Sequence, residues 1–167
     1  MTYKWGYKTP EGFDDMMMCG EGEFLTGLWF QGSRDEAKHC TDVGEKFLPI
    51  FAEVCKWLDV YFSGKKPDFV PRYKIEGQTN FRRLVTEIMN EIPYGEAVTY
   101  GDIAAKAAKR LGKEKMSAQA VGGAVGSNPI CIIVPCHRVI GANGKLTGYG
   151  GGIENKAALL KLEGIKI

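Results

Sequence analysis

The chain has 167 residues, of which 44% are hydrophobic and 25% are charged. This composition allows one compact unit, or two small lobes that share a core, and is too polar for an integral membrane protein. No apolar run approaches the ~20 residues of a membrane-spanning helix. Met1 to Pro10 lack the apolar core of a signal peptide. We therefore expect a cytoplasmic protein that contacts no membrane.

The formal net charge of +2 is unevenly distributed along the chain. Residues 1–75 contain 10 Lys and Arg against 12 Asp and Glu, whereas residues 76–167 contain 12 against 8. If a polyanion binds, the second half is the better candidate. Random variation in surface charge explains the same difference equally well.

Residues 1–75 predict a small α/β lobe. Two short apolar runs, at 16–19 and 25–30, are separated by glycines and glutamates, which is typical of a β-hairpin. Apolar side chains recur with helical spacing over residues 48–62, with a proline near the start and a glycine just past the end. Residues 63–79 contain two glycines and two prolines, and we interpret them as a linker.

The second half predicts a mostly helical lobe. An apolar stripe over residues 81–92 has helical spacing. Thr99 and Asp102 resemble a capping box for an Ala-rich helix that Gly112 ends, and Ser117 then offers an N-cap for a second short helix. Two short helices joined by a tight polar turn indicate a helix-turn-helix.

Shorter elements are expected toward the end of the chain. The apolar run 130–134 predicts a buried strand, and Asn143–Gly144 predicts a hairpin turn following Val139–Ile140. Residues 148–152 contain four glycines and one tyrosine, which is typical of a loop that allows close approach of a ligand. Residues 154–163 predict a last helix.

The five cysteines, at positions 19, 40, 55, 131 and 136, form an odd set without Cys-x-x-Cys spacing. Without a secretory signal this favours free thiols over disulfides, and we expect no metal site. Cys136 differs from the others because Pro135 ends an apolar run before it and His137 and Arg138 follow at once. A positive charge or a proton acceptor near a thiol favours the nucleophilic thiolate. A buried, inert cysteine is the equally weighted alternative, and we expect the other four cysteines to be packing residues.

Residues 133–140, Ile-Val-Pro-Cys-His-Arg-Val-Ile, resemble the active-site signature of the 6-O-alkylguanine-DNA alkyltransferases, which are also called methylated-DNA–protein-cysteine methyltransferases. The resemblance spans residues 80–164 with the motifs in the family's order, which is more specific than any single motif. Residues 1–75 match the family only loosely. The other matching segments are Ile92–Gly95, Thr99–Tyr100, Val121–Gly123, Asn128–Pro129, Gly148–Tyr149, Gly151–Gly152, Leu159–Leu160 and Glu163–Gly164.

This resemblance implies an α/β N-terminal lobe, residues 1–75, with a ribonuclease-H-like hairpin sheet and a helix. It implies a mostly α C-terminal domain, residues 76–167, with a winged-helix-like helix-turn-helix and the active-site cysteine. The expected protein is a monomer that needs no cofactor and no protein partner. Its expected substrate is double-stranded DNA carrying alkylated guanine.

The resemblance also assigns catalytic roles. The Cys136 thiolate would take the alkyl group from the 6-oxygen of guanine, once per molecule, and 4-O-alkylthymine is a second candidate lesion. His137 would take the thiol proton through a water and Glu163 would orient His137. Asn128 would stabilise the active-site turn, and the Tyr100 hydroxyl would donate to the departing base. Without the resemblance, Glu163 is more simply an exposed charge, Asn128 a turn residue and Tyr100 a half-buried aromatic.

Binding roles follow in the same way. The damaged nucleotide must rotate out of the duplex, and in the family the second helix of the helix-turn-helix enters the minor groove. Small side chains on that helix permit close approach. The expected substrate-binding residues are Tyr149, Gly150 and Val139, and the expected DNA-binding residues are Gln119, Ala118, Gly122, Gly123 and Arg138.

The sequence departs from the family pattern at two positions. Gln119 stands where the family usually places an arginine that fills the vacated space in the base stack. Glutamine lacks the positive charge and the planar guanidinium group of arginine. Gly150 stands where some relatives carry a serine that binds the damaged base. We therefore expect weaker DNA binding or slower repair, and a shifted range of accepted alkyl groups.

Three alternatives remain at the level of sequence. A non-catalytic DNA-binding module would use the same helix-turn-helix, but such relatives lack the acceptor cysteine, and Cys136 is present. A cysteine hydrolase would use Cys136 and His137, although adjacent residues rarely meet as nucleophile and base. A merely structural domain would not need so many matched polar positions.

Overall fold

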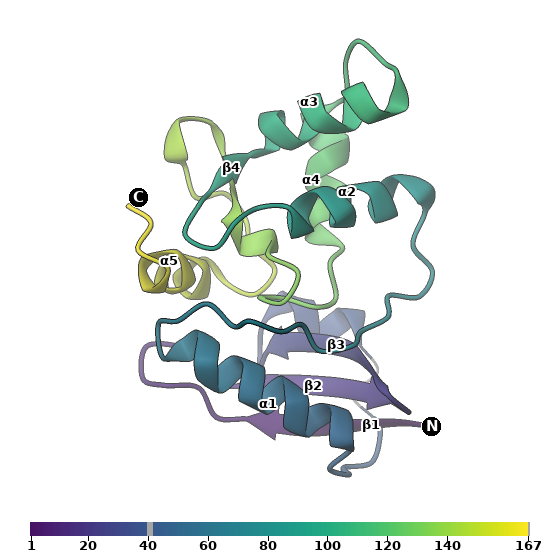
Figure 1. The fold of residues 1–167 in the computed structure, drawn as a ribbon, viewed down its shortest axis with the longest axis vertical. Helices are drawn as coiled ribbons and strands as arrows, with labels where there is room; N and C mark the ends of the chain where they lie inside the picture. The colour runs from purple at the N-terminus through teal and green to yellow at the C-terminus, as the bar shows by residue number, and fades with distance from the viewer. Residues whose placement is uncertain (40–41, 167) are drawn as a thin grey trace.

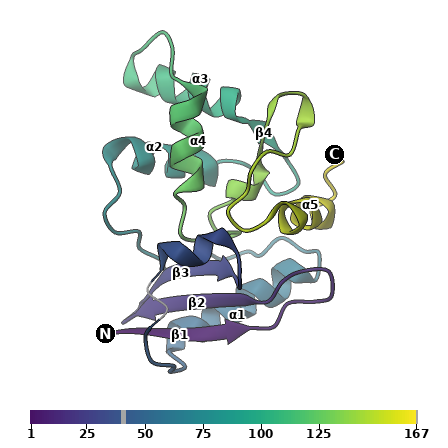
Figure 2. The ribbon, with the colours of Figure 1, turned by 180° about the vertical axis from the view of Figure 1, so that it is seen from behind.

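The computed structural model describes residues 1–39 and 42–166, so Cys40, one of the expected packing residues, lies outside the described residues. β1 (Thr2–Tyr7), β2 (Met16–Glu21) and β3 (Phe24–Phe30) form an antiparallel sheet in that order. α1 (Pro49–Phe62) covers one face of this sheet (Figure 1). The short 3-10 helix η1 (Arg34–Lys38) lies between β3 and the second lobe (Figure 2).

The expected hairpin and helix of the first lobe are confirmed as β2–β3 and α1. α1 begins at Pro49, and Gly64 after its end has a φ of +87°, a conformation that favours glycine. The buried face of α1 packs on the sheet to form the core of this lobe. Residues 63–79, which we interpreted as a linker, also pair with the sheet. The Leu25 amide of β3 donates to the Arg72 carbonyl, and the Leu25 carbonyl accepts from the Lys74 amide.

The second lobe contains three helices that pack on one another, α2 (Asn80–Asn90), α3 (Tyr100–Leu111) and α4 (Ala118–Gly126). The expected capping box exists: the Thr99 hydroxyl accepts from the Asp102 amide at 3.0 Å, and the Asp102 carboxylate accepts from the Thr99 amide at 2.9 Å. Ser117 caps α4 as expected, by accepting from the Ala120 amide. α3 and α4 therefore form the predicted helix-turn-helix. The remaining elements are β4 (Val98–Thr99), η2 (Cys136–Arg138), β5 (Val139–Ile140), η3 (Ala142–Gly144) and α5 (Ile153–Leu162).

Two expectations for the end of the chain are wrong in part. Residues 130–134 form a tight turn and no strand, because Ile132 has a φ of +68° and the Val134 amide donates back to the Ile130 carbonyl. The turn at Asn143–Gly144 forms as expected, with both residues at positive φ. It closes no hairpin ladder, since Val139–Ile140 pairs in parallel with β4.

The two lobes share one hydrophobic core that extends from β2 to α5. Leu28 of β3 donates to the Pro129 carbonyl at 2.9 Å and accepts from the Cys131 amide at 3.1 Å. The sheet of the first lobe thus directly supports the turn that precedes Cys136. The boundary between residues 75 and 76 stays a prediction. In the described part of the chain no helix is long and apolar enough to span a membrane.

Candidate active site

Cys136 follows the tight turn 130–134, and Asn128 holds this turn in place. The Asn128 side-chain nitrogen donates to the carbonyls of Ile130 and Val134 at 3.2 and 3.1 Å, and its oxygen accepts from the Ile130 amide at 3.1 Å. Asn128 is buried, so these bonds are shielded from competing water. The turn therefore presents Cys136 in a defined position.

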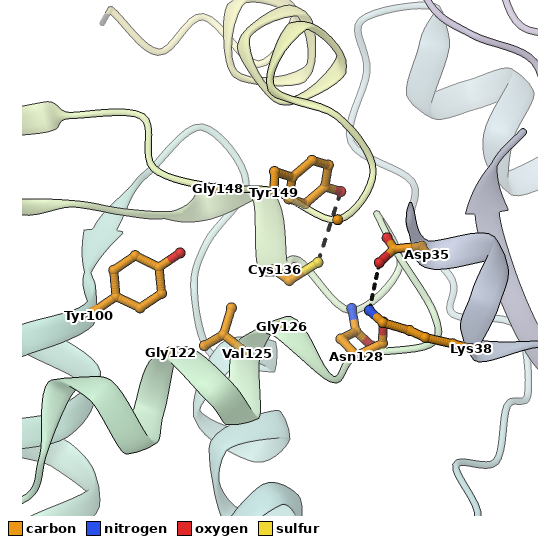
Figure 3. A pocket seen from close by; sticks show the side chains of 11 residues that line it. Asp35, Lys38, Tyr100, Gly122, Val125, Gly126, Asn128, Cys136, Gly148 and Tyr149 are labelled. Atoms are coloured by element: carbon orange, nitrogen blue, oxygen red, sulfur yellow. Dashed lines mark hydrogen bonds and ion pairs between the residues drawn. The ribbon is translucent and has the colours of Figure 1, made fainter. Parts of the chain in front are cut away.

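The Cys136 side chain borders a small cavity of about 40 Å³. Figure 3 shows Tyr100 and α4 on one side of Cys136, and Asp35 and Lys38 of η1 on the other. The Cys136 sulfur lies 3.9 Å from the Tyr149 hydroxyl oxygen. Groups from both lobes thus surround one thiol. The lining residues are Asp35, Lys38, Tyr100, Gly122, Val125, Gly126, Asn128, Cys136, Gly148, Tyr149 and Gly150.

His137, the next residue, forms a buried pair with Glu163, which directly follows α5. The distance between His137 Nε2 and Glu163 Oε2 is 2.6 Å. The Tyr61 hydroxyl donates to the same oxygen at 2.7 Å, while Glu163 Oε1 accepts from Arg138 Nε at 2.8 Å and from the Gly95 amide at 3.0 Å. His137 Nδ1 is buried and has no hydrogen-bond partner among the described residues.

The surroundings of this pair fix its resting charges. Burial by itself would raise the pKa of Glu163, but the hydrogen bond from His137, the charge that His137 carries when it is protonated, and the hydrogen bonds from Arg138 and the Gly95 amide lower it to about 2. Burial lowers the pKa of His137 despite its hydrogen bond to Glu163, so the ring is neutral at pH 7. A neutral ring that donates from Nε2 to Glu163 keeps Nδ1 as an acceptor. A proton taken up at Nδ1 would turn His137 into an imidazolium, and the ionised Glu163 carboxylate beside it would stabilise this positive charge.

Burial raises the pKa of the Cys136 thiol, so the resting sulfur is protonated. A hydrogen bond from Asn128 and the charge of Lys38 oppose this effect, whereas the charge of Asp35 adds to it. Ionisation of Cys136 therefore needs a proton acceptor nearby, which the unpartnered nitrogen of His137 can provide. In the described residues no three His, Cys, Asp or Glu side chains cluster as metal ligands.

Comparison with known proteins agrees with this geometry. Residues 80–165 match the family model for the 6-O-methylguanine DNA methyltransferase, DNA binding domain. The methylated-DNA–protein-cysteine methyltransferase of Methanosarcina acetivorans is 53% identical over 158 residues, which cover 95% of this chain and 96% of that protein. The chain belongs to the methylated-DNA–protein-cysteine methyltransferase family.

Solved structures confirm the fold of this methyltransferase. The crystal structure of Mycobacterium tuberculosis OGT in complex with DNA has a TM-score of 0.81 and 39% identity, covering 96% of this chain and 92% of that chain. The O6-methylguanine-DNA methyltransferase of Pyrococcus kodakaraensis has a TM-score of 0.68 and 26% identity, covering 99% and 100%. The expected α/β lobe followed by a helical lobe is therefore the family fold.

In this methyltransferase the structure brings together most residues expected to act in transfer. Cys136, Asn128 and Tyr100 line the cavity, and His137, which follows Cys136 in sequence, pairs with Glu163. Tyr149 and Gly150, expected to bind substrate, line the same cavity. Their individual roles stay predictions.

The residues expected to contact DNA on α4 are accessible. Ala118, Gln119 and Gly123 are exposed, and Gly122 lines the cavity. A Cβ added at Gly122 or Gly123 would meet no atom within 4 Å. The surface of α4 is therefore open where the methyltransferase family would approach DNA closely.

Two expected contacts lie elsewhere. Arg138 is buried, with its guanidinium bound to Glu163 and to the Ile92 carbonyl, so we correct its expected role from a DNA contact to a partner of Glu163. Val139 is fully buried in β5, pairs with Val98 and does not line the cavity. Both residues support the site from the interior.

Sequence reasoning missed four polar residues at or near the site. Asp35 and Lys38 line the cavity, Tyr61 donates to Glu163, and the Lys156 ammonium donates to the Val139 carbonyl at 2.6 Å. Lys156 could have been found, because Leu159 and Leu160 follow it three and four positions later on the same helical face, which indicates that this face points inward. No pattern marks the other three, since they come from elements far away in sequence.

Proposed function

We propose that this chain repairs DNA by transferring an alkyl group from the 6-oxygen of guanine to the sulfur of Cys136. The observation that carries this proposal is a cysteine thiol held at a cavity lined from both lobes, beside a His–Glu pair with a free acceptor nitrogen, in a member of this family. In one displacement the sulfur–carbon bond forms as the carbon–oxygen bond breaks. The guanine leaves as an anion and then takes up a proton.

His137 and Glu163 supply the proton acceptor. The thiol proton passes, through a bridging water, to Nδ1 of His137, and Glu163 stabilises the imidazolium that results. Glu163 is well suited to this because Arg138 and Gly95 keep its carboxylate ionised and fixed. The Tyr100 hydroxyl donates to the departing base, whose negative charge increases as the bond breaks.

The damaged nucleotide reaches Cys136 by rotating out of double-stranded DNA. A thiol that is 6% exposed cannot reach an atom inside a base stack. α4 enters the minor groove with its small residues, and Gln119 at its exposed start occupies the vacated space. Unstacking costs a few kcal/mol, which the contacts of α4 with the DNA must offset.

The product thioether does not hydrolyse readily, so each molecule acts once and no cofactor is consumed. Every reacting group comes from one chain, which supports a monomeric protein. Guanine lesions are the main substrates, and 4-O-alkylthymine is a second candidate.

Mass spectrometry of the protein after incubation with a 6-O-methylguanine duplex tests this function. We expect one peptide, containing Cys136, to become heavier by one methylene, with one lesion restored per protein molecule. The Cys136→Ser variant should bind the duplex without a mass change. Persistence of the lesion in the presence of excess wild-type protein, or methylation at another cysteine, would refute the proposal.

A further inference from the structure

Asp35 is a buried carboxylate at the reaction cavity that neither transfer nor DNA binding explains. It comes from η1 in the first lobe and is only 4% exposed. The Lys38 ammonium donates to its carboxylate at 2.6 Å and also to the Asn128 carbonyl at 3.2 Å. Asp35 is thereby tied to the residue that holds the active-site turn. Figure 3 shows this ion pair facing Cys136, opposite Tyr100.

The Asp35 carboxylate fills the space beside Gly150. A Cβ added at Gly150 would overlap Asp35 Oδ1 and would lie 2.8 Å from its Cγ. The Asp35 amide also donates to the Gly150 carbonyl at 3.2 Å, so the two backbones are in direct contact. A side chain at position 150 and the carboxylate at position 35 thus exclude each other.

We propose that Asp35 is a specificity-determining residue that closes the alkyl end of the cavity and restricts transfer to small alkyl groups. This inference rests on the proposed function. Asp35 and Lys38 line the cavity at the Cys136 sulfur on the side opposite Tyr100 and α4, so a base held on the Tyr100 side would direct its alkyl group toward the Asp35–Lys38 pair. The wall of the cavity that decides the accepted alkyl size is therefore supplied by the first lobe.

Size and polarity both act against a bulky group here. The Asp35 side chain and Lys38 form one wall of the cavity at Cys136, so a bulky alkyl group on this side would have to displace Asp35. An aromatic ring such as benzyl would also cover the ion pair without offering it a hydrogen bond, and burying charged groups in this way is costly. Methyl is small enough to avoid both penalties.

Competition between 6-O-methylguanine and 6-O-benzylguanine duplexes tests the inference in the full-length protein. The readout is the ratio of benzyl to methyl transfer rates to Cys136. We expect Asp35→Ala to raise this ratio on the order of tenfold, because pocket size alone discriminates by this much. Asp35→Asn keeps the size of the side chain and should keep a low ratio. Glu36→Ala, which removes the neighbouring carboxylate outside the cavity, is the matched control.

A pair of variants tests the mutual exclusion of positions 35 and 150. Gly150→Ser alone should transfer methyl slowly, because its Cβ meets the Asp35 carboxylate. Adding Asp35→Ala should restore methyl transfer at least tenfold over Gly150→Ser alone. An unchanged ratio in Asp35→Ala, or full activity of Gly150→Ser alone, overturns the inference. If wild-type protein transfers no methyl group, the proposed function fails instead.

Discussion

At the scale of single residues, Glu163 links stability to pH. Its folded pKa of about 2 lies below the ordinary value of 4.5, so its contribution is present above pH 4.5 and is lost as the pH falls toward 2. The shift corresponds to about 3 kcal/mol of folding free energy. We expect Glu163→Gln to lose a similar amount at pH 7, because Arg138 keeps a buried charge without its ionised partner.

Urea unfolding at several pH values measures this effect. The difference in unfolding free energy between the wild type and Glu163→Gln should narrow as the pH falls from about 5 toward 2. Glu53→Gln, at an exposed position on α1, is the control and should show no such difference. If the difference in unfolding free energy between the wild type and Glu163→Gln stays constant with pH, Glu163 is not the ionised partner of Arg138.

Burial raises the pKa of the Cys136 thiol, and Lys38 is one of the groups that oppose this shift. The Lys38 charge lowers the pKa of Cys136 while the Asp35 charge raises it, so Lys38→Gln leaves the carboxylate unopposed. We expect the pH midpoint of alkyl transfer to move upward and the rate at pH 7 to fall. The other groups that act on this thiol, Asn128, Tyr149 and Lys156, are unchanged in the variant.

The pH dependence of the single-turnover rate is the measurement for Lys38. Lys65→Gln removes the same charge from an exposed position outside the cavity and should leave the profile in place. A downward shift in Lys38→Gln, or none, would show that the ammonium does not face the sulfur.

Some residues of the site could be predicted as candidates from their neighbours in the sequence, and others only from the family resemblance. Cys136, His137 and Asn128 lie near one another in sequence, but the Pro-Cys-His pattern alone left a reactive and an inert thiol equally weighted, and the roles of all three residues came from the family resemblance. Glu163 needed the family resemblance, because a glutamate after a helix is usually exposed. Arg138 was misplaced for a related reason, since arginine is mostly exposed unless it is paired, and its partner lies 25 residues away.

At the scale of elements, α4 combines small residues with an open surface. Gly123 lies in a helix with no atom near its missing side chain, so Gly123→Ala should stabilise the fold by about 0.5–1 kcal/mol. The same methyl group would separate α4 from the minor groove and weaken DNA binding. Thermal unfolding and duplex binding at one fixed salt concentration should therefore change in opposite directions. Equal binding by both proteins would place the DNA on another surface.

Gln119 gives a second prediction for α4. Gln119→Arg should bind DNA more tightly and repair it faster, because arginine adds a charge and a planar donor group. Its logarithmic binding constant should depend more steeply on the logarithm of the salt concentration, because the variant adds one positive charge to the surface that meets the DNA. Gln31→Arg, which adds the same charge in the first lobe, is the control. Equal repair rates for Gln119→Arg and wild type would show that the charge is dispensable.

Local signals predicted elements well where local bonds decide the structure. Thr99 with Asp102 and Ser117 marked the starts of α3 and α4, and their side-chain bonds span only three residues. The prediction of a strand at residues 130–134 was wrong because an apolar segment fits a buried turn as well as a strand. What decides its conformation is Asn128 from before the run and Leu28 from the other lobe.

At the scale of the whole molecule, the active site depends on both lobes. Tyr61 of α1 donates to Glu163, Lys38 of η1 donates to the Asn128 carbonyl, and β3 bonds the turn 129–131. The predicted boundary between residues 75 and 76 therefore divides the sequence without dividing the core. A domain with its own core would fold alone, whereas a lobe that shares its core should not.

We expect the isolated fragment 76–167 to lack a cooperative unfolding transition and to transfer no alkyl group. Removing residues 1–75 exposes apolar side chains that now meet β3 and α1, and leaves Glu163 without the Tyr61 hydroxyl. Circular dichroism melts and single-turnover transfer measure the two effects, and the full chain should melt in one transition. Mixing fragments 1–75 and 76–167 should restore part of the transfer, because the missing contacts are non-covalent. If fragment 76–167 transfers the alkyl group at the rate of the full chain, the first lobe is not needed for catalysis. Asp35, which belongs to that lobe, would then not determine the accepted alkyl size.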